Sequence, residues 1–207
     1  MIIWIKESKK EKNEEKEFKI EIKEIPTFYV AYLRSKGPCT IDEFTVRYCK
    51  LISLAEKNNF HIIRNAMAIY YDSCIDFEEK ENTEYDIEVW ISVSEEREVD
   101  GLVRKFGGFK AVTAIHYGSY DNMIDTYRKV YKYIYENGYE ICGEPIDNYL
   151  VDIINTADVE NYMTELIIPI KITQGWKVNK SWLSPYWMHY SFNMKFERGV
   201  YKWVKKA

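Results

Sequence analysis

The sequence predicts an α+β fold, in which a strand-helix-strand-strand unit is duplicated with pseudo-symmetry and its antiparallel sheet borders a central ligand cleft. Three observations support this prediction. Some stretches alternate apolar and polar residues, as half-buried strands do, and two others carry apolar residues every three or four positions, as amphipathic helices do. Both kinds recur in the same order along the 207 residues. Such self-similarity indicates a duplication, and the junction of two units is a usual place for a ligand.

The first half of the chain is predicted over about residues 18–94. Phe18, Ile20 and Ile22 alternate with charged residues, which is the period of a strand, and a helical stripe that contains Phe44 and Tyr48 follows later. The predicted order is strand, extended run, helix and two strands, at residues 18–24, 28–34, 41–55, 66–71 and 86–93.

The second half, over about residues 105–171, repeats this order without the additional first strand. Its strand, helix and two strands are predicted at residues 109–117, 124–134, 145–152 and 162–170. Equivalent positions recur with a period that drifts between 77 and 81 residues: Gly37 with Gly118, Asn59 with Gly138, Tyr70 with Tyr149, and Glu88 with Glu165.

The net charge of −4 is unevenly distributed. Residues 171–207 carry a net charge of +7, which leaves −11 on residues 1–170. An acidic body is a poor surface for nucleic acid and a favourable one for cationic small molecules. The aromatic share of 16% supplies faces on which a ligand can stack.

Several classes of protein are excluded by what the sequence lacks. The four cysteines and three histidines show no metal-ligand or redox spacing, so we expect no metal, no cofactor and no disulfide framework. No apolar run is long enough for a membrane span, and residues 1–6 do not form a secretory signal. We therefore expect a cytoplasmic protein.

Short segments in both halves are similar to one known family. They are Lys36-Gly37-Pro38, IYYD at 69–72, YDI at 85–87, HYGSYDN at 116–122, ENGYE at 136–140, PIDNYLVD at 145–152 and YMTELIIPI at 162–170. Together they resemble the GyrI-like domain, also called the AraC effector-binding or multidrug-binding domain, which occurs in AraC-type and MerR-type transcription regulators. The resemblance covers about residues 18–171 and implies a pocket for lipophilic, cationic or aromatic compounds.

The resemblance also implies that a pocket acid lies on the strands at 145–152 and 162–170. Asp147 and Glu165 are both candidates, and the sequence does not decide between them. If the two strands form a hairpin, Tyr149 should lie near Glu165. Tyr162 should lie on the face opposite Glu165 unless a bulge intervenes. The candidate walls of the pocket are aromatic: Tyr149, Tyr162, Tyr117, Tyr70 and Trp90.

Two segments flank the predicted domain. Residues 1–17 form a charged N-terminal arm with no helix-turn-helix, so we expect no direct DNA binding. Residues 172–207 form a basic, aromatic extension. We expect it to fold onto the acidic body, since the charges are complementary; binding to single-stranded nucleic acid or to a membrane surface is the alternative.

The favoured function is the sensing or sequestering of a small hydrophobic ligand, without catalysis. A hydrolase of small hydrophobic electrophiles that uses a pocket carboxylate is one alternative, but no nucleophile–base pair can be read in the sequence. The other is a module that binds a protein partner, as the gyrase inhibitors of this family do.

Overall fold

The computed structural model describes residues 18–71, 84–172, 192–197 and 200–205. The charged arm at 1–17, the acidic segment predicted as a loop at 76–83, and most of the extension at 172–207 lie outside the described residues. The expected docking of the extension therefore stays a prediction. Within the extension, two strands pair with each other, β10 (Phe192–Glu197) and β11 (Val200–Lys205).

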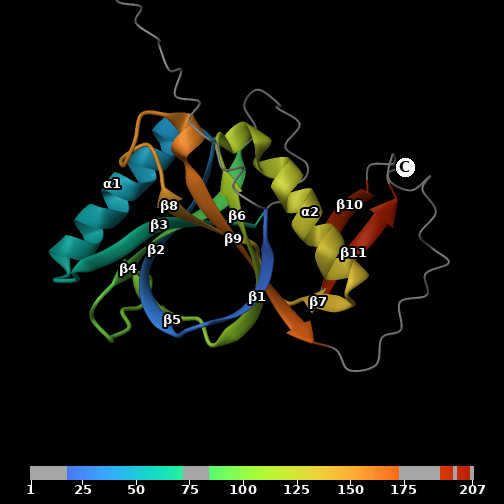
Figure 1. Ribbon diagram of the computed structural model, residues 1–207. Helices are drawn as coiled ribbons and strands as arrows, with labels where there is room; N and C mark the ends of the chain where they lie inside the picture. The colour runs from blue at the N-terminus through green and yellow to red at the C-terminus, as the bar shows by residue number, and fades with distance from the viewer. Residues whose placement is uncertain (1–17, 72–83, 173–191, 198–199, 206–207) are drawn as a thin grey trace, which may run out of the picture.

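The predicted elements of the first half are present, in the predicted order (Figure 1). The largest difference is at the second last strand, which begins at Ile62 rather than at residue 66. The elements are β1 (Ile20–Ile25), β2 (Phe28–Gly37), α1 (Ile41–Lys57), β3 (Ile62–Tyr70) and β4 (Tyr85–Val93).

The second half contains the predicted elements and two strands that were not predicted. These two, β5 (Val103–Phe106) and β7 (Tyr139–Ile141), are four and three residues long, too short to show a period of two. The other elements are β6 (Phe109–Tyr117), η2 (Tyr120–Asn122), α2 (Met123–Glu136), β8 (Ile146–Val151), η3 (Val159–Asn161) and β9 (Met163–Ile172).

Local sequence determines where both helices end. Thr40 caps the start of α1, since its hydroxyl accepts a hydrogen bond from the Glu43 amide at 3.3 Å. Asn59 follows α1 with a φ of +58°, a left-handed conformation that Asn tolerates. Gly138 follows α2 with a φ of +69°. The predicted helix stops are therefore confirmed.

Nine of the described strands, β1 to β9, form one antiparallel sheet whose order reveals the duplication. The order is β1-β6-β9-β8-β3-β4-β2-β5, and β7 also pairs with β9. Outward from the central pair, β8-β9-β6 on one side matches β3-β4-β2 on the other. The predicted α+β duplication is confirmed by this arrangement.

The outermost strands are exchanged between the halves. β1 pairs with β6 of the second half, and β5 pairs with β2 of the first half. The connections that lead out of β1 and β5 meet where the Gly108 amide donates to the Ile25 carbonyl at 2.8 Å. A Cβ at Gly107, where φ is +100°, would lie 2.0 Å from the Pro26 carbonyl oxygen, so this crossing requires glycine.

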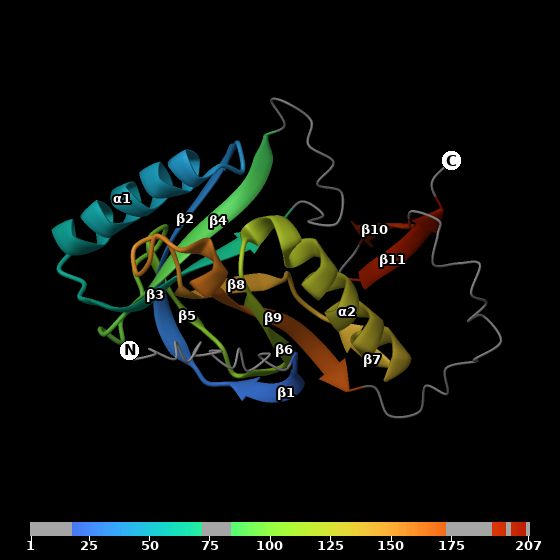
Figure 2. The same ribbon diagram turned by 45° about the horizontal axis from the view of Figure 1, so that its top comes forward.

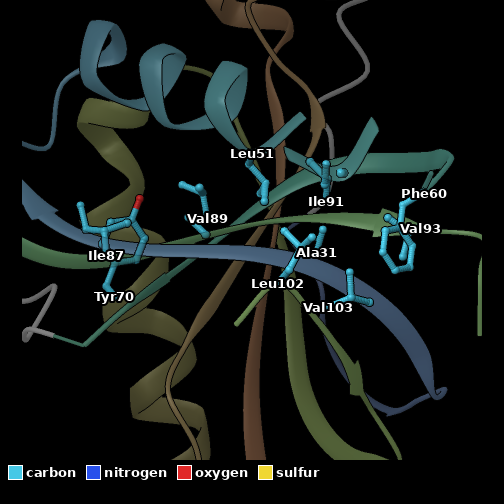
Figure 3. Packing of buried hydrophobic residues seen from close by; sticks show 12 residues of the cluster. Ala31, Leu51, Phe60, Tyr70, Ile87, Val89, Ile91, Val93, Leu102 and Val103 are labelled. Atoms are coloured by element: carbon cyan, nitrogen blue, oxygen red, sulfur yellow. The ribbon is translucent and has the colours of Figure 1, made fainter. Parts of the chain in front are cut away.

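Both helices cover the same face of the sheet, which we call the helix face (Figure 2). Under α1, Leu51 packs with Val89, Ile87 and other residues of β2, β3 and β4 (Figure 3). A second core lies between α2 and strands β6 and β9. A third core, which contains Trp90 and no helix residue, fills the other side of the sheet, the opposite face.

Candidate functional site

Asp147 is the buried acid at the centre of the helix face. It lies on β8, directly across from Ala68 of β3, where the two halves of the sheet meet. Its side chain is 2% exposed, and the Tyr127 hydroxyl of α2 donates a hydrogen bond to Oδ1 at 2.5 Å. Among the ion pairs between described residues, none involves Asp147. The carboxyl group is thus buried against hydroxyls rather than against a cation.

This environment strongly changes the pKa of Asp147. Burial raises the pKa of Asp147 to about 7, although hydrogen bonds from the hydroxyls of Tyr127 and Tyr70 lower it. Near neutral pH both protonation states are therefore populated. Such a group can donate a proton, accept one, or pair with a cation that enters its surroundings.

Tyrosines from both halves surround the acid. The hydroxyls of Tyr70 on β3 and Tyr149 on β8 lie 3.0 Å apart. Tyr120 connects Tyr149 and Tyr162, with ring centroids 5.7 and 5.2 Å away. We call Asp147 and the tyrosines around it the Asp147 cluster; its tyrosines are Tyr48, Tyr70, Tyr120, Tyr127, Tyr149 and Tyr162.

Three hydroxyls of this cluster, those of Tyr48, Tyr70 and Tyr149, remain protonated over the accessible pH range. Burial raises the pKa values of Tyr48, Tyr70 and Tyr149 well above the ordinary value, and the charge of Asp147 raises them further. Tyr48, Tyr120 and Tyr149 are only half-buried. The cluster therefore presents the neutral hydroxyls of Tyr48, Tyr70 and Tyr149 and aromatic faces, part of which remain accessible.

One further hydroxyl belongs to this region. Thr164 of β9 lies directly across from Tyr149 and is fully buried. Its Oγ1 has no hydrogen-bond partner among the described residues, in contrast to the neighbouring His116, whose ring nitrogens contact Thr126 and the Ser119 carbonyl. Buried polar groups normally have a partner, so Thr164 offers an unused hydrogen-bonding group beside the cluster.

Glu165 lies on the opposite face, away from Asp147. Its carboxylate accepts hydrogen bonds from Lys23 of β1 at 3.0 Å and from Asn148 at 3.1 Å. The expected proximity of Tyr149 and Glu165 is wrong. β8 and β9 do pair, but the register places Asn148 across from Glu165 and Tyr149 across from Thr164. Residues paired in this way share a face, and neighbours along a strand do not.

Two candidate aromatic residues also lie on the opposite face. Trp90 is fully buried there, and its indole nitrogen donates to Glu88 at 2.5 Å. Tyr117 is on that face as well, because it alternates with Ala114 and Val112, which face α2. The candidates therefore separate into Asp147, Tyr149, Tyr162 and Tyr70 on the helix face and Glu165, Tyr117 and Trp90 on the opposite face.

Sequence analysis missed Tyr48, Tyr120, Tyr127 and Thr164 as members of the site. Tyr48 and Tyr127 both lie on helical stripes, where they were read as core residues. The repeat could have identified this pair, because they have the same separation along the chain as Tyr70 and Tyr149, 79 residues. Their roles are parallel as well, since each hydroxyl reaches a central strand, Tyr48 donating to the Met67 carbonyl at 2.6 Å.

The described part of the chain contains neither a metal-ligand cluster nor a helix that could span a membrane. No group of three or more His, Cys, Asp or Glu residues there is arranged to hold a metal ion. No helix in these same ranges is long and apolar enough to cross a membrane.

Solved structures share this architecture. The C-terminal domain of EcmrR is 23% identical, with a TM-score of 0.59, and the match covers 75% of this chain and 99% of that one. EcmrR in its complex with DNA is 22% identical, with a TM-score of 0.63 and 75% coverage of this chain; the match spans only 58% of the EcmrR chain. A hydrolase from Listeria innocua is 13% identical, with a TM-score of 0.51 and coverage of 74% and 92%.

The family assignment comes from the sequence of the domain itself. No curated protein matches the chain. The GyrI-like small molecule binding domain, in contrast, matches residues 18–171, the part of the chain that contains both halves of the duplicated sheet. The chain therefore belongs to the GyrI-like family of small-molecule-binding domains.

Proposed function

We propose that this protein binds a small lipophilic cation at the Asp147 cluster and serves as a ligand-binding effector that does not itself bind DNA. The observation that carries the proposal is a buried carboxyl group that is surrounded by tyrosines and pairs with no cation among the described residues. The net charge of −11 on residues 1–170 supports both parts of the proposal, since it attracts cations and repels phosphate.

The arrangement matches the chemistry of an organic cation. A positive charge about 4 Å from ionised Asp147 would gain about 4 kcal/mol at an effective dielectric constant near 20. The faces of half-buried Tyr120 and Tyr149 would add cation–π attraction. The ligand's apolar groups would gain from contact with these rings.

Calorimetric titration with a matched pair of compounds tests the proposal. Benzyltrimethylammonium carries the charge, and neopentylbenzene has the same shape without it. The wild-type protein should prefer the cation. Asp147→Asn should weaken cation binding by about tenfold or more, because it removes the buried charge, and should leave the neutral compound unaffected. Cation binding should also strengthen as pH rises through about 7, where Asp147 ionises.

Glu165→Gln is the matched control, because it neutralises the other candidate acid on the opposite face. We expect it to leave cation binding unchanged. Equal binding of both compounds would refute the electrostatic part of the proposal. Loss of cation binding in Glu165→Gln alone would assign the site to the opposite face.

A second candidate function is hydrolysis, which the environment of Asp147 favours. A carboxyl group whose pKa is about 7 can act as a general base near neutral pH. It could accept a proton from a water that attacks an electrophilic carbon, while a protonated tyrosine such as Tyr149 donates to the leaving oxygen. Styrene oxide is a suitable probe, with the diol as its product. Turnover that is lost in Asp147→Asn and kept in Glu165→Gln would support hydrolysis, and no turnover by the wild type would count against it.

A further inference from the structure

Arg47, on α1, is a buried cation with almost no partners. Its side chain is 2% exposed, and Nε, Nη1 and Nη2 make no hydrogen bond to any residue that the structure describes. The ion pair that it forms with a described residue joins Nε to Glu43 Oε1 at 3.5 Å, and Glu43 is itself partly exposed. Apart from this ion pair, the five N–H donors of the guanidinium group make no hydrogen bond within the described ranges.

A buried guanidinium group without hydrogen bonds is unfavourable unless a binding partner supplies them. A buried charge that lacks hydrogen bonds carries a large desolvation cost, and buried arginines in proteins are normally paired. A hydrocarbon side chain would fill the same place more favourably. The unused donors thus point to an anionic group that binds there.

The Arg47 guanidinium group lies directly against the backbone at Gly37. A Cβ at Gly37 would lie 2.7 Å from Nη2, so glycine at this position keeps backbone atoms, and no side chain, against the guanidinium. Arg47 also lies in the first two turns of the 17-residue helix α1, whose N-terminal end carries partial positive charge. The partial positive charge of this helix end favours an anion nearby.

Phe44 connects this place to the Asp147 cluster. The carbon at the centre of the Arg47 guanidinium is 5.7 Å from the centroid of the Phe44 ring. The same ring lies 6.3 Å from the ring of Tyr70, a member of the cluster. The Phe44 ring therefore lies between the Arg47 guanidinium group and the Asp147 cluster.

The charges of Asp147 and Arg47 both affect the pKa of the Cys39 thiol. Although Cys39 is exposed as a residue, desolvation of its sulfur raises the pKa of the thiol to about 11. The Asp147 carboxylate adds to this rise in pKa, and the Arg47 guanidinium opposes it. Asp147 and Arg47 thus both lie close enough to the Cys39 sulfur for their charges to act on it.

We propose that Arg47 is the anion-recognising group of a second subsite, next to the Asp147 cluster, and that the ligand of this domain carries an oxyanion as well as a cationic group. The cationic half of this inference rests on the proposed function, and the anionic half does not. Carboxylate is the best match, because its two oxygens fit the planar fork of a guanidinium. A phosphate group shares this chemistry.

The first test uses anions alone. Calorimetric titrations with sodium benzoate and with inorganic phosphate, at constant ionic strength adjusted with chloride, separate the two kinds of oxyanion. We expect benzoate to bind the wild-type protein and Arg47→Met to weaken this binding by about tenfold or more. Arg47→Lys should weaken it less, because lysine keeps the charge without the fork. Arg128→Met is the control, since Arg128 lies on the surface of α2 and pairs with Asp125.

A second measurement distinguishes recognition from a structural role. Without an anion, Arg47→Met should raise the melting temperature, because it removes an unpaired buried charge. A structural arginine would give the opposite sign. A lowered melting temperature together with no Arg47-dependent binding of either benzoate or phosphate would overturn the proposal.

The Asp147→Asn variant separates failure of this inference from failure of the proposed function. We expect it to lose benzyltrimethylammonium binding and to retain benzoate binding. A zwitterion that joins both groups, 4-(trimethylammoniomethyl)benzoate, should bind the wild type at least tenfold more tightly than benzyltrimethylammonium does. Binding of the cation with no gain from the carboxylate would refute the Arg47 subsite and leave the proposed function intact.

Discussion

Asp147 and Glu88 are two equally buried acids on opposite faces of one sheet, each 2% exposed, and the chain treats them differently. Glu88 pairs with Arg104 of β5, and Trp90 donates to the same carboxylate. Asp147 receives hydrogen bonds from tyrosine hydroxyls. The difference shows that this fold can provide a buried acid with a cation from its own chain, and that it does so on one face.

The Glu88 site also shows what a completed site looks like. The Arg104 guanidinium lies 4.3 Å from the centroid of the Tyr32 ring and 5.0 Å from that of Trp90. Carboxylate, cation and aromatic faces are thus combined within the chain. Around Asp147 the carboxyl group and the aromatic rings are present, and we propose that a ligand supplies the cation.

The largest expected change in stability comes from breaking the Glu88–Arg104 ion pair. Arg104→Met should lower the free energy of unfolding by about 3 kcal/mol, because it leaves Glu88 buried and unpaired. The estimate is at the lower end of the range for buried pairs, since Arg104 is 35% exposed. Urea unfolding measures it. Adding Glu88→Gln should recover part of the loss; a cost below about 1 kcal/mol for Arg104→Met would mean that Glu88 does not depend on its partner.

Asp147→Asn should have the opposite sign in the ligand-free protein. Because the pKa of Asp147 is raised from 3.8 to about 7, the folded protein holds a proton that the unfolded chain releases. The stability from this proton is full below about pH 4 and declines by about 1.4 kcal/mol per pH unit until about pH 7.

Asparagine does not titrate, so the variant should gain on the wild type over this pH window. We expect it to be about 2 kcal/mol more stable at pH 8, after allowance for its imperfectly paired amide, and to show no advantage at pH 4. Thermal unfolding at both pH values measures this. A variant that is less stable at pH 8 would mean that the carboxylate is well compensated in the fold.

The smallest effect should be at Glu165. Its partner Lys23 is 42% exposed, so solvent screens the pair and Glu165→Gln should cost less than about 1 kcal/mol. The cost should shrink further in 0.5 M salt. Unfolding in urea with and without the added salt provides the measurement. A large loss of stability that salt does not change would mean that Glu165, like Glu88, depends strongly on its cationic partner.

Much of the fold could be predicted from the sequence because the relevant signals are local. Helical stripes, alternating strands and the stops at Asn59 and Gly138 each depend on residues within one element. The repeat then related the two halves, so that Tyr70 and Tyr149 were recognised as equivalent, and their hydroxyls do meet.

The contacts between strands could not be predicted in the same way. Period two assigns a residue to one of two faces but does not give the register with the next strand, which is why Tyr149 was expected beside Glu165. The partners of Glu165 and Glu88, Lys23 and Arg104, lie on the exchanged strands β1 and β5. Lys23 is 142 residues from Glu165, and Arg104 lies on a strand of four residues that shows no clear period. Arg47 was hidden by its residue type, since an arginine on a helix usually faces solvent.

The exchange of β1 and β5 has a consequence for how the chain folds. β1 must wait for a strand more than 80 residues away, because Ile25 pairs with Phe109 and Ile20 with Ala114. Closing so long a loop is slow. Strands that are close in sequence should therefore pair early, and β1 should pair with β6 late. Each half obtains its outermost strand from the other half. The domain should therefore unfold in one cooperative transition, despite its two helix-covered cores.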